Sequence, residues 1–500
     1  MGGFLLIFLV LFPMAGAVAG YLTGRKNKSA RDWLVLAVTV VELLGALLLL
    51  YFPGATLRLD GICGLGLTFQ ADGFRMVMAL LTAAVWMMTT LPSRSYFAHA
   101  RNRNRYYLFL LLALGATMGI FLSGDLYTTF IFFEMMSFAS YVWVVQEETP
   151  EAISASRSYL TIGVLGGLVT LMGVFLLYHL AGTLQLDALR DACAAVENRR
   201  LLYAAGGCIL FGFAAKAGMF PLHFWMLRSY TAAPAPATAI LSAVLSKAGI
   251  FGVLIVSCDM FYRDADWGML ILMLGVVTML LGAVLGLFSV NLKRTLACSS
   301  MSQIGFILVG VGMQGLLGAH NQLAVYGTVL HMINHSLIKL ILFVIAGVIF
   351  TRVGSLDLNE IRGWGRGKPL VMFCFFMAAV GVGGIPLWSG YISKTLLHES
   401  IVEYIEILSA QGGAGLMRTV EWLFLIAGGM TLAYMTKLFV AVFLEKKPGS
   451  EKPAKELYMD KPTSVMLTVC GALLLVFGLF AHSTMDHIAE VSRSFLGGEA

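Results

Sequence analysis

The chain has 500 residues, of which 59% are hydrophobic and 12% carry a charge. Soluble domains carry roughly twice that charged fraction, so the composition excludes a soluble globular protein. Apolar runs of about 18 or more residues recur along the whole length, which is the pattern of membrane-spanning helices. The sequence therefore predicts an all-α protein that crosses the membrane many times and has the lipid bilayer as its main environment.

Several other classes are excluded by motifs and charge. The net charge of +6 comes from basic residues in short loops between apolar runs, so it does not indicate nucleic-acid binding. No G-x-x-x-x-G-K-[ST] phosphate loop occurs, so we expect no direct use of ATP. The seven cysteines are scattered without a C-x-x-C or a Cys/His spacing that suits zinc or iron–sulfur clusters. We therefore expect no metal and no cofactor.

The first apolar run is predicted to be a spanning helix rather than a cleaved leader, because its positive charges follow the apolar core. The glycine-rich stretch 54–72 is too short to span and is expected at the outer surface. The polar connection 445–460 is expected to be a solvated linker, with contact to a partner as the alternative. In all we predict about fourteen spans, with the approximate bounds 3–23, 32–52, 74–92, 106–123, 125–146, 157–181, 201–226, 237–257, 267–289, 298–316, 322–351, 369–401, 417–444 and 461–482.

The charges in the loops predict an orientation. Most Lys and Arg residues lie in the loops that follow odd-numbered spans, which places these loops in the cytoplasm of a cell-membrane protein. Both termini are then expected outside the cytoplasm.

Two predicted spans are interrupted by glycine and proline. The seventh breaks at 218–221 and the twelfth at 383–386, five spans apart. An odd number of spans per repeat forces inversion, so spans 4–8 and 9–13 are predicted to be inverted five-helix repeats with a transport site near the membrane midplane. The expected divisions are 1–105, 106–257, 267–444 and 461–500.

Ionisable side chains inside the spans are the functional candidates, because each costs a few kcal/mol in a bilayer. The deepest are Glu134, Lys216, Lys247, His331, His335, Lys339 and Lys394. Lys437 is close enough to the linker to snorkel. Glu42 and His179 are expected to be satisfied helix contacts or interface groups, and the roles of Glu42, His223 and Lys437 stay open.

Two groups of these candidates favour proton transfer. The Glu134 carboxylate needs a cation or a proton, and Lys216 is its expected partner. His331, His335 and Lys339 are spaced i, i+4, i+8, which puts them on one helix face over about 12 Å. Such a stripe indicates a proton path, because histidine binds protons near neutral pH. Metal binding by the histidine pair is the alternative.

The motifs together resemble one family. They are FFEMMS, AAKAGMFPLHFWM, APAPATAILSAVLSKAG, LKRTLACSSMSQIG, HMINHSLIKLILF and GIPLWSGYISK. This set is similar to the antiporter-like membrane subunits of respiratory complex I, Mrp-type sodium/proton antiporters and energy-converting hydrogenases or formate hydrogenlyases. The resemblance implies that Glu134 and Lys216 form a central pair, that Lys247 and the His331–Lys339 stripe relay protons, and that Lys394 leads to the exit.

The resemblance leaves two functions open. The first is a proton- or sodium-translocating subunit of a redox-driven complex of the complex I or hydrogenase type, with the redox centres held by other membrane subunits. The second is a subunit of an Mrp-type sodium/proton antiporter, which runs on an existing ion gradient. A purely structural membrane anchor is disfavoured by the number of buried charges.

Overall fold

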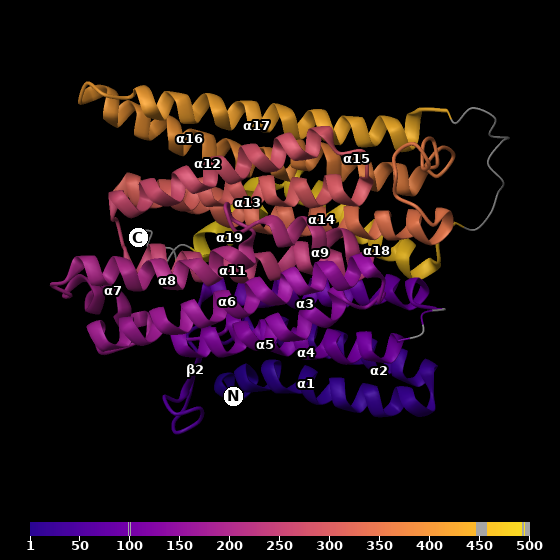
Figure 1. Cartoon of the computed structure of the whole chain (residues 1–500), viewed down its shortest axis with the longest axis horizontal. Helices are drawn as coiled ribbons and strands as arrows, with labels where there is room; N and C mark the ends of the chain where they lie inside the picture. The colour runs from indigo at the N-terminus through magenta and orange to yellow at the C-terminus, as the bar shows by residue number, and fades with distance from the viewer. Residues whose placement is uncertain (99, 101, 447–457, 493–494, 496–500) are drawn as a thin grey trace.

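The computed structural model describes residues 1–98, 100, 102–446, 458–492 and 495. Long helices lie side by side along one axis and form an elongated bundle, ordered from α1 at one edge to α17 at the other (Figure 1). The C-terminal helices α18 and α19 return to the middle, where they contact α3 and α14. The α-helices are α1 Gly2–Lys26, α2 Lys28–Leu49, α3 Gly73–Tyr96, α4 Arg103–Phe121, α5 Leu126–Val144, α6 Pro150–Ala181, α7 Leu186–Ala194, α8 Arg199–Ala217, α9 Phe224–Ala232, α10 Ala235–Ile240, α11 Ser246–Ile255, α12 Ala265–Phe288, α13 Leu292–Leu317, α14 Gln322–Val353, α15 Pro369–Gly383, α16 Ser389–Ala410, α17 Gly415–Phe439, α18 Lys461–Leu479 and α19 Ala481–Ser492.

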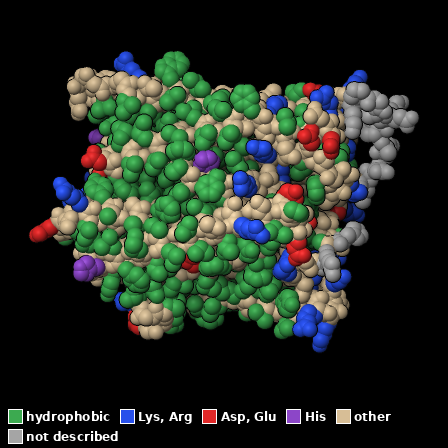
Figure 2. All heavy atoms as spheres, viewed as in Figure 1, with side chains coloured by type: hydrophobic (Ala, Val, Ile, Leu, Met, Phe, Trp, Pro, Cys, Tyr) green, Lys and Arg blue, Asp and Glu red, His purple; other side chains and the backbone are tan. Residues whose placement is uncertain are grey.

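The bundle is built to cross a membrane. Within the described residues, 12 helical segments are long and apolar enough to do so. Figure 2 shows a broad hydrophobic band on one face, with charged side chains gathered mainly toward its two ends. Helix α5 and the broken pair α15 and α16 occupy predicted spans but are not among the 12. The all-helical multi-pass class is therefore confirmed, and the count of fourteen stays a prediction.

The stretch 54–72, which is expected not to span the membrane, contains a β-hairpin. Strands β1 Thr56–Leu59 and β2 Leu67–Gln70 pair antiparallel, with Thr56 opposite Gln70. The hairpin lies at the same end of the bundle as the start of α1, and we call this the hairpin end (Figure 1). The opposite end, which carries residues 354–368, is called the linker end. Residues 447–457 of the predicted solvated linker lie outside the described residues.

The two predicted helix breaks have the same backbone geometry. Helix α8 ends at Gly218 with φ +80° and α15 ends at Gly384 with φ +77°, the left-handed conformation that glycine adopts without strain. The following amides, of Met219 and Ile385, each bond the carbonyl five residues back, at 3.0 and 3.2 Å. Both breaks are thus Schellman caps, which end the helix inside the bundle and leave nearby carbonyls available to side chains.

The predicted eighth span, 237–257, contains a feature that its apolar pattern does not indicate. Between α10 and α11 lies a π-helical turn, η1 Leu241–Leu245, and a second one, η2 Val256–Met260, follows α11. A π-turn disturbs the regular i→i−4 ladder and is frequent at functional sites. The turn η1 directly precedes Lys247.

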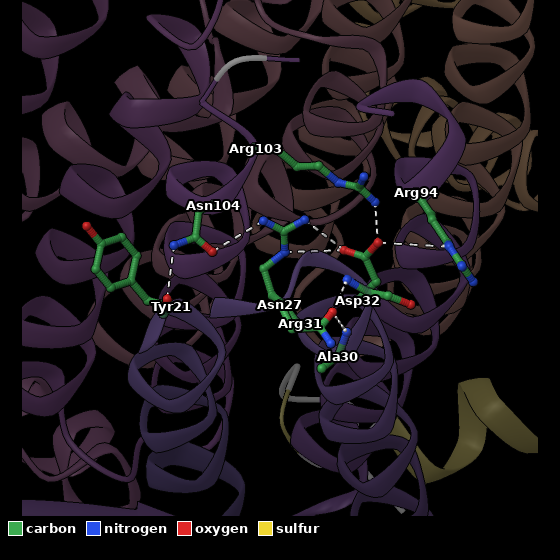
Figure 3. A network of polar contacts seen from close by, with 9 residues as sticks. Tyr21, Asn27, Ala30, Arg31, Asp32, Arg94, Arg103 and Asn104 are labelled. Atoms are coloured by element: carbon green, nitrogen blue, oxygen red, sulfur yellow. Dashed lines mark hydrogen bonds and ion pairs between the residues drawn. The ribbon is translucent and has the colours of Figure 1, made fainter. Parts of the chain in front are cut away.

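At the linker end, an ion network joins the first four helices (Figure 3). Arg31 donates hydrogen bonds to Asp32 at 3.2 and 2.9 Å and to Asn104 at 3.3 Å. Arg103 of α4 also bonds Asp32, and Arg94 of α3 lies 3.9 Å from it. Asp32 and Arg31 are buried, and breaking such a pair costs about 3–5 kcal/mol. The network fixes α2 against α3 and α4. It shares no residue with the candidate functional site.

Candidate functional site

The basic residues predicted from the sequence lie buried in the core of the bundle. Helices α8, α11, α14 and α16 supply them, and all six are at most 8% exposed. Glu134 on α5 is partly buried. Uncompensated cations at such depth are costly unless carbonyls, hydroxyls or imidazoles meet them, and the structure provides these groups in three clusters. The six residues are Lys216, Lys247, His331, His335, Lys339 and Lys394.

The first cluster surrounds Lys216, in the last turn of α8. Its ammonium donates a hydrogen bond to the Tyr159 hydroxyl, lies 4.6 Å from the centre of that ring, and is 3.5 Å from the Ser140 hydroxyl. Tyr159 and Ser140 are themselves 2.5 Å apart. A cavity of about 20 Å³ beside Lys216 and Trp225 is large enough for one water molecule. The sequence did not identify Tyr159 or Ser140, because neither is charged.

Glu134 does not form the expected direct ion pair with Lys216. No salt bridge within 4.0 Å joins them in the described structure, and Oε1 of Glu134 has no hydrogen-bond partner there. The carboxylate packs against α6, since a Cβ atom on Gly167 would lie 2.5 Å from Oε1. The ammonium of Lys216 is held by Tyr159 instead, so pairing with Glu134 would require one of the two side chains to move.

The second cluster joins Lys247 of α11 to His335 of α14. The Lys247 Nζ atom lies 2.5 Å from Nδ1 of His335 and donates to the Ser242 carbonyl at 2.8 Å. Ser242 belongs to the π-turn η1, and its hydroxyl is 2.8 Å from that of Ser300 on α13. At this contact one nitrogen must donate and the other accept, so the two groups share one proton along the line between them.

The third cluster links His331 to the second helix break. Nε2 of His331 lies 3.0 Å from Oε1 of Gln303, and Nδ1 lies 3.0 Å from the Ser393 hydroxyl. The next residue, Lys394, donates to the carbonyl of Val382 in the last turn of α15 at 2.8 Å. A cation there is favoured by the helix dipole. Gln303 and Ser393 lie inside motifs recognised in the sequence, but only the packing shows that they flank His331.

The predicted histidine–lysine stripe on α14 is continuous along the helix, yet its members face different neighbours. His335 contacts α11, His331 contacts α13 and α16, and Lys339 donates to the Leu296 carbonyl of α13 at 3.0 Å. No hydrogen bond joins the Lys216 cluster to Lys247 among the described residues. Two aromatic residues of α9 connect the regions, since Trp225 donates to the Ala215 carbonyl of α8 at 2.7 Å and Tyr230 to the Leu241 carbonyl of η1 at 3.0 Å.

The four weaker candidates, which are Lys437, His179, Glu42 and His223, lie in different surroundings. Lys437 donates to three carbonyls at the end of α12, at 2.6–3.3 Å, which is a helix cap. His179 is exposed. Glu42 is fully buried, and among the described residues neither of its carboxylate oxygens has a hydrogen-bond partner, so it is not a satisfied helix contact within this chain and its role as an interface group stays a prediction. His223 stacks on Phe220, with ring centres 5.9 Å apart.

Metal binding finds little support in the geometry. In the part of the chain that the structure describes, no group of three or more His, Cys, Asp or Glu side chains could hold a metal ion. The groups that meet His331 and His335 are a hydroxyl, an amide oxygen and an ammonium, and among the described residues no carboxylate or thiolate contacts either ring.

The sequence of the site region decides the family. Residues 123–444 match the model described as "NADH:quinone oxidoreductase/Mrp antiporter, TM". The chain belongs to this family. The resemblance predicted from the motifs is thereby confirmed, and the matched region contains all seven predicted site residues, from Glu134 to Lys394.

Individual relatives come from different complexes of this family. An Na(+)/H(+) antiporter subunit of Alkalihalophilus pseudofirmus is 29% identical over 435 residues, which cover 86% of this chain and 84% of that protein. Hydrogenase-4 component B of Escherichia coli is 26% identical over 442 residues, covering 86% of this chain and 65% of that protein. A chain of the membrane-bound sulfane sulfur reductase, an archaeal respiratory membrane complex, has the same fold, with a TM-score of 0.86, 23% identity and coverage of 99% and 98%.

Proposed function

We propose that this antiporter-like membrane protein moves protons through the buried row Lys216, Lys247, His335, His331 and Lys394 within a multi-subunit redox-driven complex. The observation that carries the proposal is the contact of 2.5 Å between Lys247 and His335, two fully buried basic groups. Two such groups in one hydrogen bond share one proton. A second proton on the pair is lost readily, because burial disfavours the charged form of the lysine and of the histidine.

Three steps would make up the transfer. Lys216 releases its proton when a change of charge nearby alters the interactions of the Lys216 ammonium with Glu134 and Tyr159. The proton then reaches the Lys247–His335 contact, crosses one helical turn to His331, and passes by Ser393 to Lys394. The breaks after α8 and α15 leave carbonyls that can meet water and so support access to the row from each side.

An external energy source is required for pumping. Moving one charge against 100 mV requires about 2.3 kcal/mol. In a redox-driven complex this energy comes from partner subunits, and the similarity to Hydrogenase-4 component B supports that assignment. Lys339 would anchor the stripe to α13 through the Leu296 carbonyl. It would lie beside the direct path, because among the described residues no hydrogen bond joins it to a member of the row.

The second candidate is an Mrp-type subunit that exchanges sodium and protons on an existing gradient. Its support is the 29% identity to the Na(+)/H(+) antiporter protein of Alkalihalophilus pseudofirmus, over most of both chains. The same row of residues would serve either function, so the driving force and the ion have to be measured.

We also infer the orientation and the repeat. The loop charges support an orientation with the hairpin end outside the cytoplasm and the linker end inside it. The matching Schellman caps at Gly218 and Gly384 support two inverted units, residues 106–257 and 267–444. Residues 1–105 and 461–500 then flank the pair.

The test uses the complex as it exists. The complex would be purified through an affinity tag on this chain and reconstituted into vesicles that contain a pH-sensitive dye. Lys216→Ala is expected to abolish proton movement driven by the complex, whereas Lys28→Ala, an exposed lysine outside the row, is expected to leave it unchanged. Unchanged movement in an assembled Lys216→Ala complex would contradict the proposal.

The co-purified subunits separate the two functions. Redox subunits, together with proton uptake that starts on addition of their electron donor, support the first candidate. Proton movement that needs only an imposed sodium gradient supports the second.

A further inference from the structure

A histidine–glutamate pair lies one helical turn beyond Lys394, on the side of the hairpin end. His398 follows Lys394 by four residues on α16, about 6 Å along the helix axis. Nε2 of His398 lies 3.2 Å from the Glu421 carboxylate of α17, and Nδ1 lies 3.8 Å from Glu399. No other part of the proposed route uses these residues.

The pair is more exposed than Lys394. Lys394 is 8% exposed, whereas the side chains of His398 and of its partner Glu421 on α17 are 24% and 27% exposed. Beyond them, α16 lines an open cavity of about 370 Å³ at the hairpin end. Its lining residues are mainly polar and include His320, Asn321, Gln322, Glu399, Glu403 and Glu406. His398 and Glu421 do not line this acidic vestibule themselves, and the link to it is Glu399, which lies 3.8 Å from His398 and is one of the lining residues.

An aromatic pair separates Lys394 from His398. The Lys394 ammonium lies 4.5 Å from the centre of the Phe306 ring, and Phe306 packs edge-on against Phe424 at 4.8 Å. The His398 ring centre is 6.0 Å from that of Phe424. No hydrogen bond joins Lys394 to His398 among the residues that the structure describes, so transfer between them needs a bridging water.

We propose that His398 and Glu421 form the proton exit from Lys394 into the vestibule at the hairpin end. The proposal rests on the proposed function, because it assumes that Lys394 delivers protons. The Lys394 ammonium gives up one proton and becomes a neutral amine, and the His398 imidazole takes one and becomes an imidazolium. The Glu421 carboxylate stabilises this cation, which then releases its proton to water in the vestibule.

The groups that face His398 fit this role. Glu421 lies on the neighbouring helix α17, and Glu399 and Lys394 lie on its own helix. Glu399 also lines the vestibule, so the ring has a carboxylate neighbour on the side to which the proton leaves.

The structural alternative is that the pair only pins α16 to α17. His398→Gln tests this, because an amide can still donate to Glu421 and cannot carry a proton. His398→Ala opens room for imidazole added to the hairpin-end side of the vesicles. The matched control is His179→Gln, an exposed histidine on α6.

In the reconstituted complex, His398→Gln is expected to lower proton movement at least about tenfold. Imidazole is expected to restore much of the rate in His398→Ala, and His179→Gln is expected to behave as the unmodified chain. A full rate in His398→Gln, or a low rate in both variants without rescue by imidazole, would overturn the exit proposal. Failure of the proposed function itself has a different signature, since Lys216→Ala would then retain the full rate.

Discussion

The Nζ atom of Lys247 and the Nδ1 atom of His335 lie 2.5 Å apart, on two helices that are 88 positions apart in the sequence. Both side chains are almost completely buried. Because the two side chains share one proton, neither is an unpaired group in the membrane interior. A lone ammonium or imidazolium would be costly there. The contact also makes the pair a step in a relay, because the proton can move to either nitrogen.

Replacing His335 should interrupt this step. In His335→Ala the Lys247 ammonium keeps only the Ser242 carbonyl as a partner, so its charged form becomes less stable. Proton movement by the reconstituted complex is expected to fall about 10- to 100-fold, while gel filtration shows the complex assembled. An assembled variant with an unchanged rate would argue against a role for His335.

Tyr159 should matter through its hydroxyl alone. Tyr159→Phe keeps the ring that lies under Lys216 and removes the group that accepts its hydrogen bond. The rate is expected to drop several-fold rather than vanish, because Ser140 lies within 3.5 Å and a water can fill the neighbouring cavity. Ser140→Ala alone should have a smaller effect, and Tyr159→Phe combined with Ser140→Ala the largest. Equal rates in all three would show that these hydroxyls are not used.

The helix break after α8 gives a stability prediction. Gly218→Ala places a side chain at φ +80°, next to Met226, and is expected to lower the free energy of unfolding by about 1–2 kcal/mol. Gly207→Ala in the same helix meets no atom within 4 Å and should stabilise slightly, by about 0.5–1 kcal/mol. Thermal unfolding in detergent measures both. A Gly218→Ala chain as stable as Gly207→Ala would show that the break is not held in this conformation.

Cysteine labelling tests the inferred orientation. Cys63 is exposed in the hairpin, whereas Cys193 in α7 at the same end is buried. Burial, helped by the Asp259 carboxylate, raises the pKa of the Cys193 thiol to about 12, so little thiolate forms near pH 8. A membrane-impermeant maleimide added to intact cells is expected to label the chain once, and Cys63→Ser should abolish the signal. Labelling only after the cells are opened would show that the hairpin end faces the cytoplasm, opposite to the inferred orientation.

The sequence identified the parts of the site that depend on local pattern. Helical spacing places His331, His335 and Lys339 on one helix, and glycine followed by proline marks the breaks that end α8 and α15. The partners could not be predicted in this way, because they depend on how helices distant in sequence pack. Tyr159 meets Lys216 across 57 residues, and the expected pairing of Glu134 with Lys216 is not formed.

Two further features were missed for the same reason. The π-turn before Lys247 lies in a uniformly apolar run, so no periodicity indicates it. His398 sits in a mixed stretch of charges that is typical of a solvated helix face, and its partner Glu421 comes from the next helix. A pattern along one helix shows which residues share a face, but not which groups meet them.

The most direct test of the proton row is Lys247→Met in the complex reconstituted into vesicles, with proton movement driven by an imposed membrane potential. Methionine fills similar space without a charge or a proton. We predict that movement falls to the level of vesicles without protein, while Lys28→Met keeps the full rate. Full proton movement in an assembled Lys247→Met complex would contradict the claim that protons pass through this row.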